Sequence, residues 1–200
     1  MFPPFTSNVR HTTDDSVAAF RSPLPVAGFT RPSLVLRRPE RYTFLTPMSI
    51  YRQNAATIIT DGNGRVLLCE RADMPGACQT VQGGIDPGET PEAAARRELW
   101  EEVGLSDERF EIIGSLPDPI RYDWPPEVKA KLMKPKDKDF DGQEQYFFLA
   151  RVAPDAPFDL DTHEREFSRV WWGTPRELVD GAWEYKRAVL SSALTQFGML

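Results

Sequence analysis

The sequence predicts an α/β protein in which helices cover both faces of a mixed β-sheet. Short segments rich in β-branched and aromatic residues recur between residues 54 and 172, and few helical patterns are interleaved with them. Hydrophobic residues make up 40% and charged residues 27% of the 200 residues. These proportions are ordinary for a globular protein, so a sizeable hydrophobic core is available.

Residues 1–47 differ in composition from the rest of the chain. They contain seven of the 18 prolines, six arginines, no lysine and three acidic residues, which gives a net charge of +3. No helical or alternating period persists there, so we expect a mostly disordered tail before a domain at residues 48–200. Three interpretations compete: an organellar transit peptide, a basic arm that touches RNA, and translated sequence upstream of a true start at Met48. We favour the last.

The regular part of the chain begins with two short β-rich segments. Residues 54–60 (NAATIIT) and 65–71 (RVLLCER) flank the turn signal DGNG, and this arrangement predicts a β-hairpin. The segment that follows, residues 72–84, is predicted to be a loop. Further strands are predicted at residues 110–117, 143–153 and 169–172.

Three helices are predicted from their end signals and apolar spacing. For a helix at residues 91–103, Thr90 offers a capping hydroxyl, Pro91 suits the first position, and Gly104 is suited to follow the last turn. The sequence TPRE at residues 174–177 has the capping-box pattern. The last helix carries apolar side chains at spacings of four, at Tyr185, Val189, Ala193 and Phe197.

The cysteines and the net charge limit the classes of function. Cys69 and Cys78 are too few for a disulfide framework or a four-cysteine metal site, so we expect reduced, inert thiols in the cytoplasm. No apolar run approaches the roughly 18 residues that cross a bilayer. A net charge of −6 argues against simple ionic binding of nucleic acid. An anionic substrate would therefore need a divalent metal ion.

The predicted helix at residues 91–103 carries three glutamates that repel one another. At about 100° per residue, Glu98, Glu101 and Glu102 share one arc beside the buried stripe of the helix. Each like-charge pair at these spacings costs about 0.2–0.5 kcal/mol. Oxygen ligands in this number suit Mg²⁺ or Mn²⁺, and the glycine-rich loop before the helix allows close approach of phosphates. A solvated acidic helix face is the alternative interpretation.

Residues 83–105 resemble the Nudix box, G-x5-E-x7-R-E-U-x-E-E-x-G-U, in which U is an aliphatic residue. The sequence agrees at every fixed position, namely Gly83, Glu89, Arg97, Glu98, Leu99, Glu101, Glu102, Gly104 and Leu105. The resemblance implies an α/β/α Nudix sandwich with a mixed sheet between helices. It also implies hydrolysis of a nucleoside diphosphate that is linked to another moiety.

The same resemblance implies roles for residues of the box. Glu98, Glu101 and Glu102 would bind two or more Mg²⁺ or Mn²⁺ ions, next to the backbone at Gly83. Arg97 and Glu89 would form an ion pair that holds the loop against the helix.

Segments outside the box resemble the branch of this family that contains bacterial RNA pyrophosphohydrolases and dinucleoside polyphosphate hydrolases. The matching segments are YRQN (51–54), QGGIDPGE (82–89), RYDWP (121–125), GQEQYFFL (142–149), EFSRVWW (166–172) and EYKRAVL (184–190). The resemblance implies that the chain removes pyrophosphate from 5′-triphosphorylated RNA, splits dinucleoside polyphosphates, or does both. Cys78 and Val81 replace the Trp and Pro of the branch, which puts the shape of the substrate groove in doubt.

The resemblance to this branch also implies roles outside the box. Glu166 would be a further metal ligand, and either Glu102 or Glu166 would be the general base. Arg52 would contact a substrate phosphate, Tyr185 would stack on a base, and Lys186 would bind phosphate. The remaining matched polar residues near the substrate groove are Gln143 and Gln145. Without the resemblance, Tyr185 fits a core position, Arg52 a surface charge and Glu166 a solvated charged run.

Two other functions compete with this interpretation. One is a housekeeping hydrolase of free or damaged nucleoside triphosphates, which the flanking segments disfavour. The other is a nucleotide-binding sensor without catalysis, but such proteins usually lose glutamates of the box, and this chain keeps all of them. Neither membrane binding nor a stable protein partner is implied. The lysines at residues 129, 131, 134, 136 and 138 would suit a polyphosphate or RNA, although we expect a solvated loop there.

Overall fold

The computed structural model describes residues 49–131, 137, 139–153 and 155–200, so the tail predicted at residues 1–47 lies outside it. One mixed sheet forms the centre of the described region. Its strands are β1 (Tyr51–Thr60), β2 (Val66–Arg71), β3 (Cys78–Gln79), β4 (Val81–Gly84), β5 (Phe110–Ser115), β6 (Ile120–Asp123), β7 (Gly142–Val152) and β8 (Phe167–Gly173). The helices are α1 (Pro91–Val103), the short η1 (Asp107–Arg109), α2 (Pro126–Lys131), α3 (Pro175–Gly181) and α4 (Glu184–Gln196).

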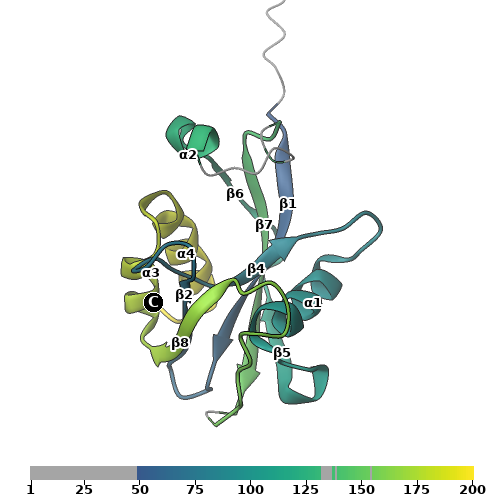
Figure 1. The fold of residues 1–200 in the computed structure, drawn as a ribbon, viewed down its shortest axis with the longest axis vertical. Helices are drawn as coiled ribbons and strands as arrows, with labels where there is room; N and C mark the ends of the chain where they lie inside the picture. Colours follow the sequence, from purple (N-terminus) through teal and green to yellow (C-terminus); the bar gives the residue numbers. More distant parts are fainter. Residues whose placement is uncertain (1–48, 132–136, 138, 154) are drawn as a thin grey trace, which may run out of the picture. The chain divides into compact units, whose positions relative to one another are not determined.

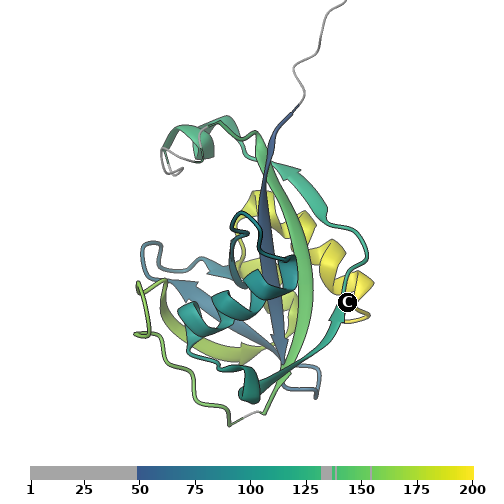
Figure 2. The same ribbon diagram turned by 90° about the vertical axis from the view of Figure 1, so that its right-hand side faces the viewer.

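Helices lie on both faces of this sheet, as the sequence predicts. Figures 1 and 2 show α1 on one face and the pair α3 and α4 on the other. In the described region, three clusters of buried apolar residues lie between the layers: one beneath α3 and α4, and two beneath α1. The predicted α/β/α arrangement is confirmed.

The centre of the sheet is a parallel pair of strands. β1 and β7 pair over ten positions, from Tyr51 opposite Gly142 to Thr60 opposite Arg151. Residues 54–60 of β1 are all buried, as is typical of a strand covered on both faces. β4 pairs antiparallel with β1, whereas β5 and β6 pair antiparallel with β7.

The predicted hairpin forms only beside its turn. β1 and β2 pair where Thr60 faces Val66, and the strands then diverge to take other partners. β2 pairs along its length with β8, which is about 100 residues further along the chain. Local patterns predict that a segment is a strand, but they do not contain the side-chain packing that selects a distant partner.

Two segments were assigned incorrectly from the sequence. The predicted loop at residues 72–84 contains β3 and β4, and the lysine-rich stretch contains α2 next to β6. Strands of two and four residues and a helix of six are too short to show a period, which explains the error. The lysines at positions 134, 136 and 138 lie outside the described residues.

The predicted helix ends are confirmed. The hydroxyl of Thr90 accepts a hydrogen bond of 3.2 Å from the N–H of Ala93, and the N–H of Gly104 donates to Trp100. Thr174 and Glu177 form the capping box at the start of α3. Among the described residues, no helix has both the length and the apolar character that crossing a membrane requires.

Replacing Gly104 with alanine is expected to lower the free energy of unfolding more than replacing Gly198. Both glycines follow a helix, with φ values of 68° and 70°, so each alanine pays about 1 kcal/mol for left-handed backbone. At Gly104 the added Cβ would also lie 2.7 Å from the Cβ of Asp159, whereas nothing lies within 4 Å at Gly198. Urea denaturation measures the difference, and equal losses would contradict the packing of Asp159 against the end of α1.

Candidate active site

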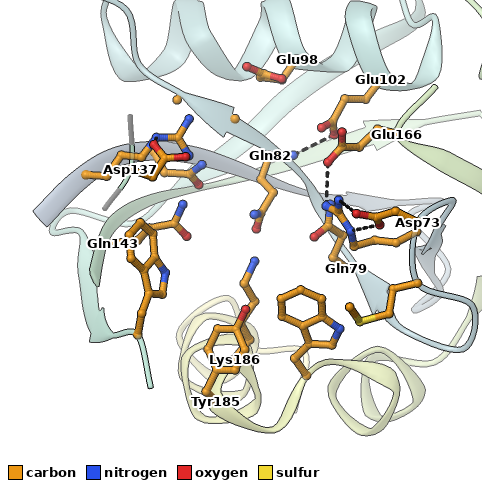
Figure 3. A pocket seen from close by; sticks show the side chains of 18 of the residues that line it. Asp73, Gln79, Gln82, Glu98, Glu102, Asp137, Gln143, Glu166, Tyr185 and Lys186 are labelled. Carbon is orange, nitrogen blue, oxygen red and sulfur yellow. Dashed lines mark hydrogen bonds and ion pairs between the residues drawn. The ribbon is translucent and has the colours of Figure 1, made fainter. Parts of the chain in front are cut away.

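A cleft of about 440 Å³ separates α1 from the first turn of α4. Figure 3 shows Glu98 and Glu102 on the α1 side, and Tyr185 and Lys186 on the α4 side. The central strands of the sheet supply the residues between these two walls. The cleft therefore brings together residues that are more than 80 positions apart in the chain.

The α1 wall carries buried carboxylates. Glu98 and Glu102 lie one turn apart and are each only 8% exposed, whereas Glu101 is more accessible. Gly83 on β4 makes room for Glu98, because a methyl group at Gly83 would overlap the Glu98 carboxylate. The backbone N–H of Gln82 donates to Glu102 Oε2 over 3.0 Å. β4 thus fixes the position of both carboxylates.

Arg97 neutralises part of this wall. Its Nη1 lies 2.5 Å from Glu98 Oε1 and 3.1 Å from Glu101 Oε2. The ion pair between Arg97 and Glu89 that the resemblance implied is present, with two contacts of 3.0 Å. Arg97 also donates to the carbonyl oxygen of Gly84 over 2.8 Å. One guanidinium group therefore connects the loop, β4 and the acidic edge of α1.

Arg71 is a second counter-ion, which the sequence analysis did not identify. Its Nη1 donates to Glu166 Oε1 over 2.7 Å, and its Nε and Nη2 donate to the two carboxylate oxygens of Asp73 over 2.7 and 2.8 Å. Figure 3 shows Glu166 beside Glu102. The only signal in the sequence was a charged residue at the end of a strand, directly before a loop.

The environment of the cleft shifts several pKa values. Burial raises the pKa of Glu102 well above its ordinary value, and the nearby charges of Glu98 and Glu166 raise it further. Burial also raises the pKa of Glu98, despite the opposing effect of Arg97. On the opposite wall, burial lowers the pKa of Lys186 to about 8. Glu98 and Glu101 contact Arg97, whereas Glu102 accepts the backbone N–H of Gln82, so Glu102 is the least neutralised of the three.

The donor set suits a hard divalent cation. Glu98, Glu101, Glu102 and Glu166 line one cleft and offer only oxygen atoms, which Mg²⁺ and Mn²⁺ prefer and Zn²⁺ does not. Within the described parts of the chain, however, no three acidic, histidine or cysteine side chains lie close enough together to hold a metal ion as they stand. Arginine contacts hold Glu98, Glu101 and Glu166, so a cation would have to displace these contacts.

Four of the predicted substrate residues line the cleft. Arg52 lies against Gly84, and its Nε is 3.2 Å from Asp137 Oδ1. Tyr185 packs on the core, with its ring centroid 5.4 Å from that of Trp183, and also faces the cleft. The other two are Lys186 and Gln143, and Gln143 accepts a hydrogen bond from Tyr122.

Gln145 does not line the cleft, unlike the other predicted substrate residues. It is 3% exposed and lies behind Asn54 and Gln82, which do line the cleft and which the sequence analysis did not single out. Its side-chain nitrogen donates to Asn54 Oδ1 and to Gln82 Oε1, each over 2.9 Å. Gln145 thus lies near the cleft without lining it, and its role in substrate binding stays a prediction.

Replacing Glu102 with glutamine is expected to stabilise the protein at pH 8 when a chelator is present. Because folding raises the pKa of Glu102, its contribution to stability is greatest below about pH 4.3 and falls as the pH rises. Glutamine keeps the acceptor for Gln82 and carries no charge, so the variant should gain at least about 1 kcal/mol at pH 8 and little at pH 4. Urea denaturation at both pH values measures the free energy of unfolding. A variant that is less stable than the wild type at pH 8 would contradict the conclusion that burial destabilises the charged form of Glu102.

Comparison with known proteins gives the family. A model of the NUDIX domain matches residues 50–193. The chain is 41% identical over 154 residues to an RNA pyrophosphohydrolase of Erythrobacter litoralis, covering 75% of this chain and 92% of that protein. It is 36% identical over 153 residues to Nudix hydrolase 25 of Arabidopsis thaliana, covering 74% and 86%.

A solved structure has the same fold. The E. coli dihydroneopterin triphosphate pyrophosphohydrolase aligns with a TM-score of 0.57 and 17% identity, covering 74% of this chain and 99% of that chain. The family match, the identity to these relatives and the arrangement of the box glutamates agree with one another. The chain belongs to the Nudix hydrolase family.

Proposed function

We propose that this chain removes pyrophosphate from 5′-triphosphorylated RNA, splits dinucleoside polyphosphates, or does both, with the help of Mg²⁺ or Mn²⁺. The proposal rests on one observation above all. A single cleft contains an acidic wall on α1 and Glu166, and it also contains the cationic side chains Arg52 and Lys186. Identity to RNA pyrophosphohydrolases over most of their length supports the RNA substrate.

The two kinds of charge in the cleft suit two parts of one reaction. Divalent ions held by Glu98, Glu101, Glu102 and Glu166 would supply Lewis-acid polarisation of the phosphate chain and a bound water of lowered pKa. Arg52 and Lys186 face the same space without contributing to the acidic wall, so they can bind phosphate oxygens.

The remaining residues of the site orient the substrate and accept a proton. The ring of Tyr185 forms part of the cleft wall and can stack on a base. Glu102 is suited to accept the proton of the attacking water, because its burial raises its pKa. Glu166 is the other candidate for this role, and carboxylates this close to one another titrate as a set.

Replacing Glu98 with glutamine is expected to lower the rate of hydrolysis by about 100-fold or more, because it removes a charged oxygen ligand from the cleft. Glu92→Gln is the matched control: Glu92 lies on the same helix, is exposed, and pairs with Arg96 outside the cleft. Circular dichroism checks that both variants are folded. Hydrolysis at the wild-type rate by the Glu98 variant would contradict the proposal.

A substrate panel separates the activities. Phosphate and pyrophosphate release are measured at matched Mg²⁺ with 5′-triphosphorylated RNA, diadenosine tetraphosphate and free nucleoside triphosphates. The proposal expects release from the RNA, the dinucleotide or both, at rates above those for free triphosphates, and no release with excess chelator. Faster turnover of free triphosphates would favour the housekeeping alternative. Hydrolysis that persists with excess chelator would contradict the proposed role of a divalent metal ion.

A further inference from the structure

Three side-chain amides meet beneath the cleft, and the strand register explains why. Asn54 on β1 lies opposite Gln145 on the parallel strand β7, so the two side chains project from the same face. On the other side of β1, Gln82 lies opposite Ala56, two residues beyond Asn54, and therefore shares that face as well. Gln145 is the most deeply placed of the three relative to the cleft, because only Asn54 and Gln82 line it.

The hydrogen bonds of Gln145 determine which ends of the other amides face the cleft. Its two N–H groups donate to Asn54 Oδ1 and Gln82 Oε1, each over 2.9 Å. The side-chain carbonyl oxygens of Asn54 and Gln82 therefore accept these hydrogen bonds, and the NH₂ groups of the two residues take no part in them. In the described part of the chain, neither NH₂ group has a hydrogen-bond acceptor. Asn54 is only 1% exposed and lines the cleft, so the cleft is the main place where its NH₂ group could meet a hydrogen-bond acceptor.

The reverse orientation of the three amides is less favourable. It would leave both N–H groups of Gln145 buried without acceptors, and an unpaired buried N–H costs more than an unpaired carbonyl. It would also turn two carbonyl dipoles toward a cleft whose α1 wall carries buried carboxylates. Both effects favour NH₂ groups that face the cleft.

We propose that Gln145 is a positioning residue, which turns the NH₂ groups of Asn54 and Gln82 toward the cleft as donors to the oxygens of a bound polyphosphate. Neutral amides suit this place because they donate hydrogen bonds to phosphate but form no ion pair with the glutamates. A lysine would form such an ion pair. The inference rests on the proposed function, since it assumes that a polyphosphate occupies the cleft.

The direct test is an NMR titration of the side-chain amides with Mg²⁺ and the β,γ-methylene analogue of ATP, a polyphosphate that cannot be hydrolysed at its β,γ bridge. The Asn54 and Gln82 NH₂ resonances, assigned from Asn54→Ala and Gln82→Ala, are expected to shift, and those of Gln145 to shift much less. Loss of the Gln82 and Asn54 responses in Gln145→Met supports the positioning role. Unshifted Asn54 and Gln82 resonances in the saturated wild-type protein would overturn it.

Kinetics with diadenosine tetraphosphate provide a second readout. Gln145→Met is expected to raise KM about tenfold with a smaller change in kcat, because it weakens binding of the phosphates. Gln53→Met is the matched control, since Gln53 lies on β1 outside this cleft and bonds to Glu144. An unchanged KM in the Gln145 variant would contradict the inference. Amide shifts in a protein that cleaves no polyphosphate would instead support the inference and refute the proposed function.

Discussion

Buried negative charge along one edge of α1 is the constraint on which the site depends. Glu98 and Glu102 are each 8% exposed, and removing a carboxylate from water costs several kcal/mol unless partners offset it. Arg97 offsets the charge of Glu98, and Arg71 that of Glu166. Glu102 accepts a hydrogen bond from the backbone of Gln82, yet its pKa stays raised. Arg97 and Arg71 thus contact carboxylates whose mutual repulsion a divalent cation would also relieve.

The surrounding structure accommodates this charge. Gly83 leaves the space that the Glu98 carboxylate occupies, and Gly84 supplies a carbonyl oxygen that holds Arg97. The opposite wall contributes the partly buried Lys186, and the strands contribute the neutral amides of Asn54 and Gln82. Asp73 and Asp137 also line the cleft, and they pair with Arg71 and Arg52. An anionic substrate would therefore meet the cationic side chain of Lys186 on the wall opposite the glutamates.

Features that depend on neighbouring residues in the chain, such as helix ends, could be predicted from the sequence. Contacts that depend on the pairing of distant strands could not. The limits of α1 follow from Thr90, Pro91 and Gly104, which act within a few positions of themselves. The partnership of Arg71 with Glu166 spans 95 positions and depends on the pairing of β2 with β8. The hairpin prediction failed beyond its turn for the same reason. Gln145 was predicted to lie near the substrate groove, but only the register of three strands shows that it contacts Asn54 and Gln82.

We expect the glutamates that line the cleft from α1 to bind a divalent cation. Calorimetric titration with Mn²⁺ at pH 6 and pH 8.5, in buffers of different ionisation enthalpy, tests this most directly. Because a metal ion competes with protons for the same carboxylates, binding should release protons at pH 6 and fewer at pH 8.5. Absence of binding, or a heat at pH 6 that is the same in every buffer, would contradict the account.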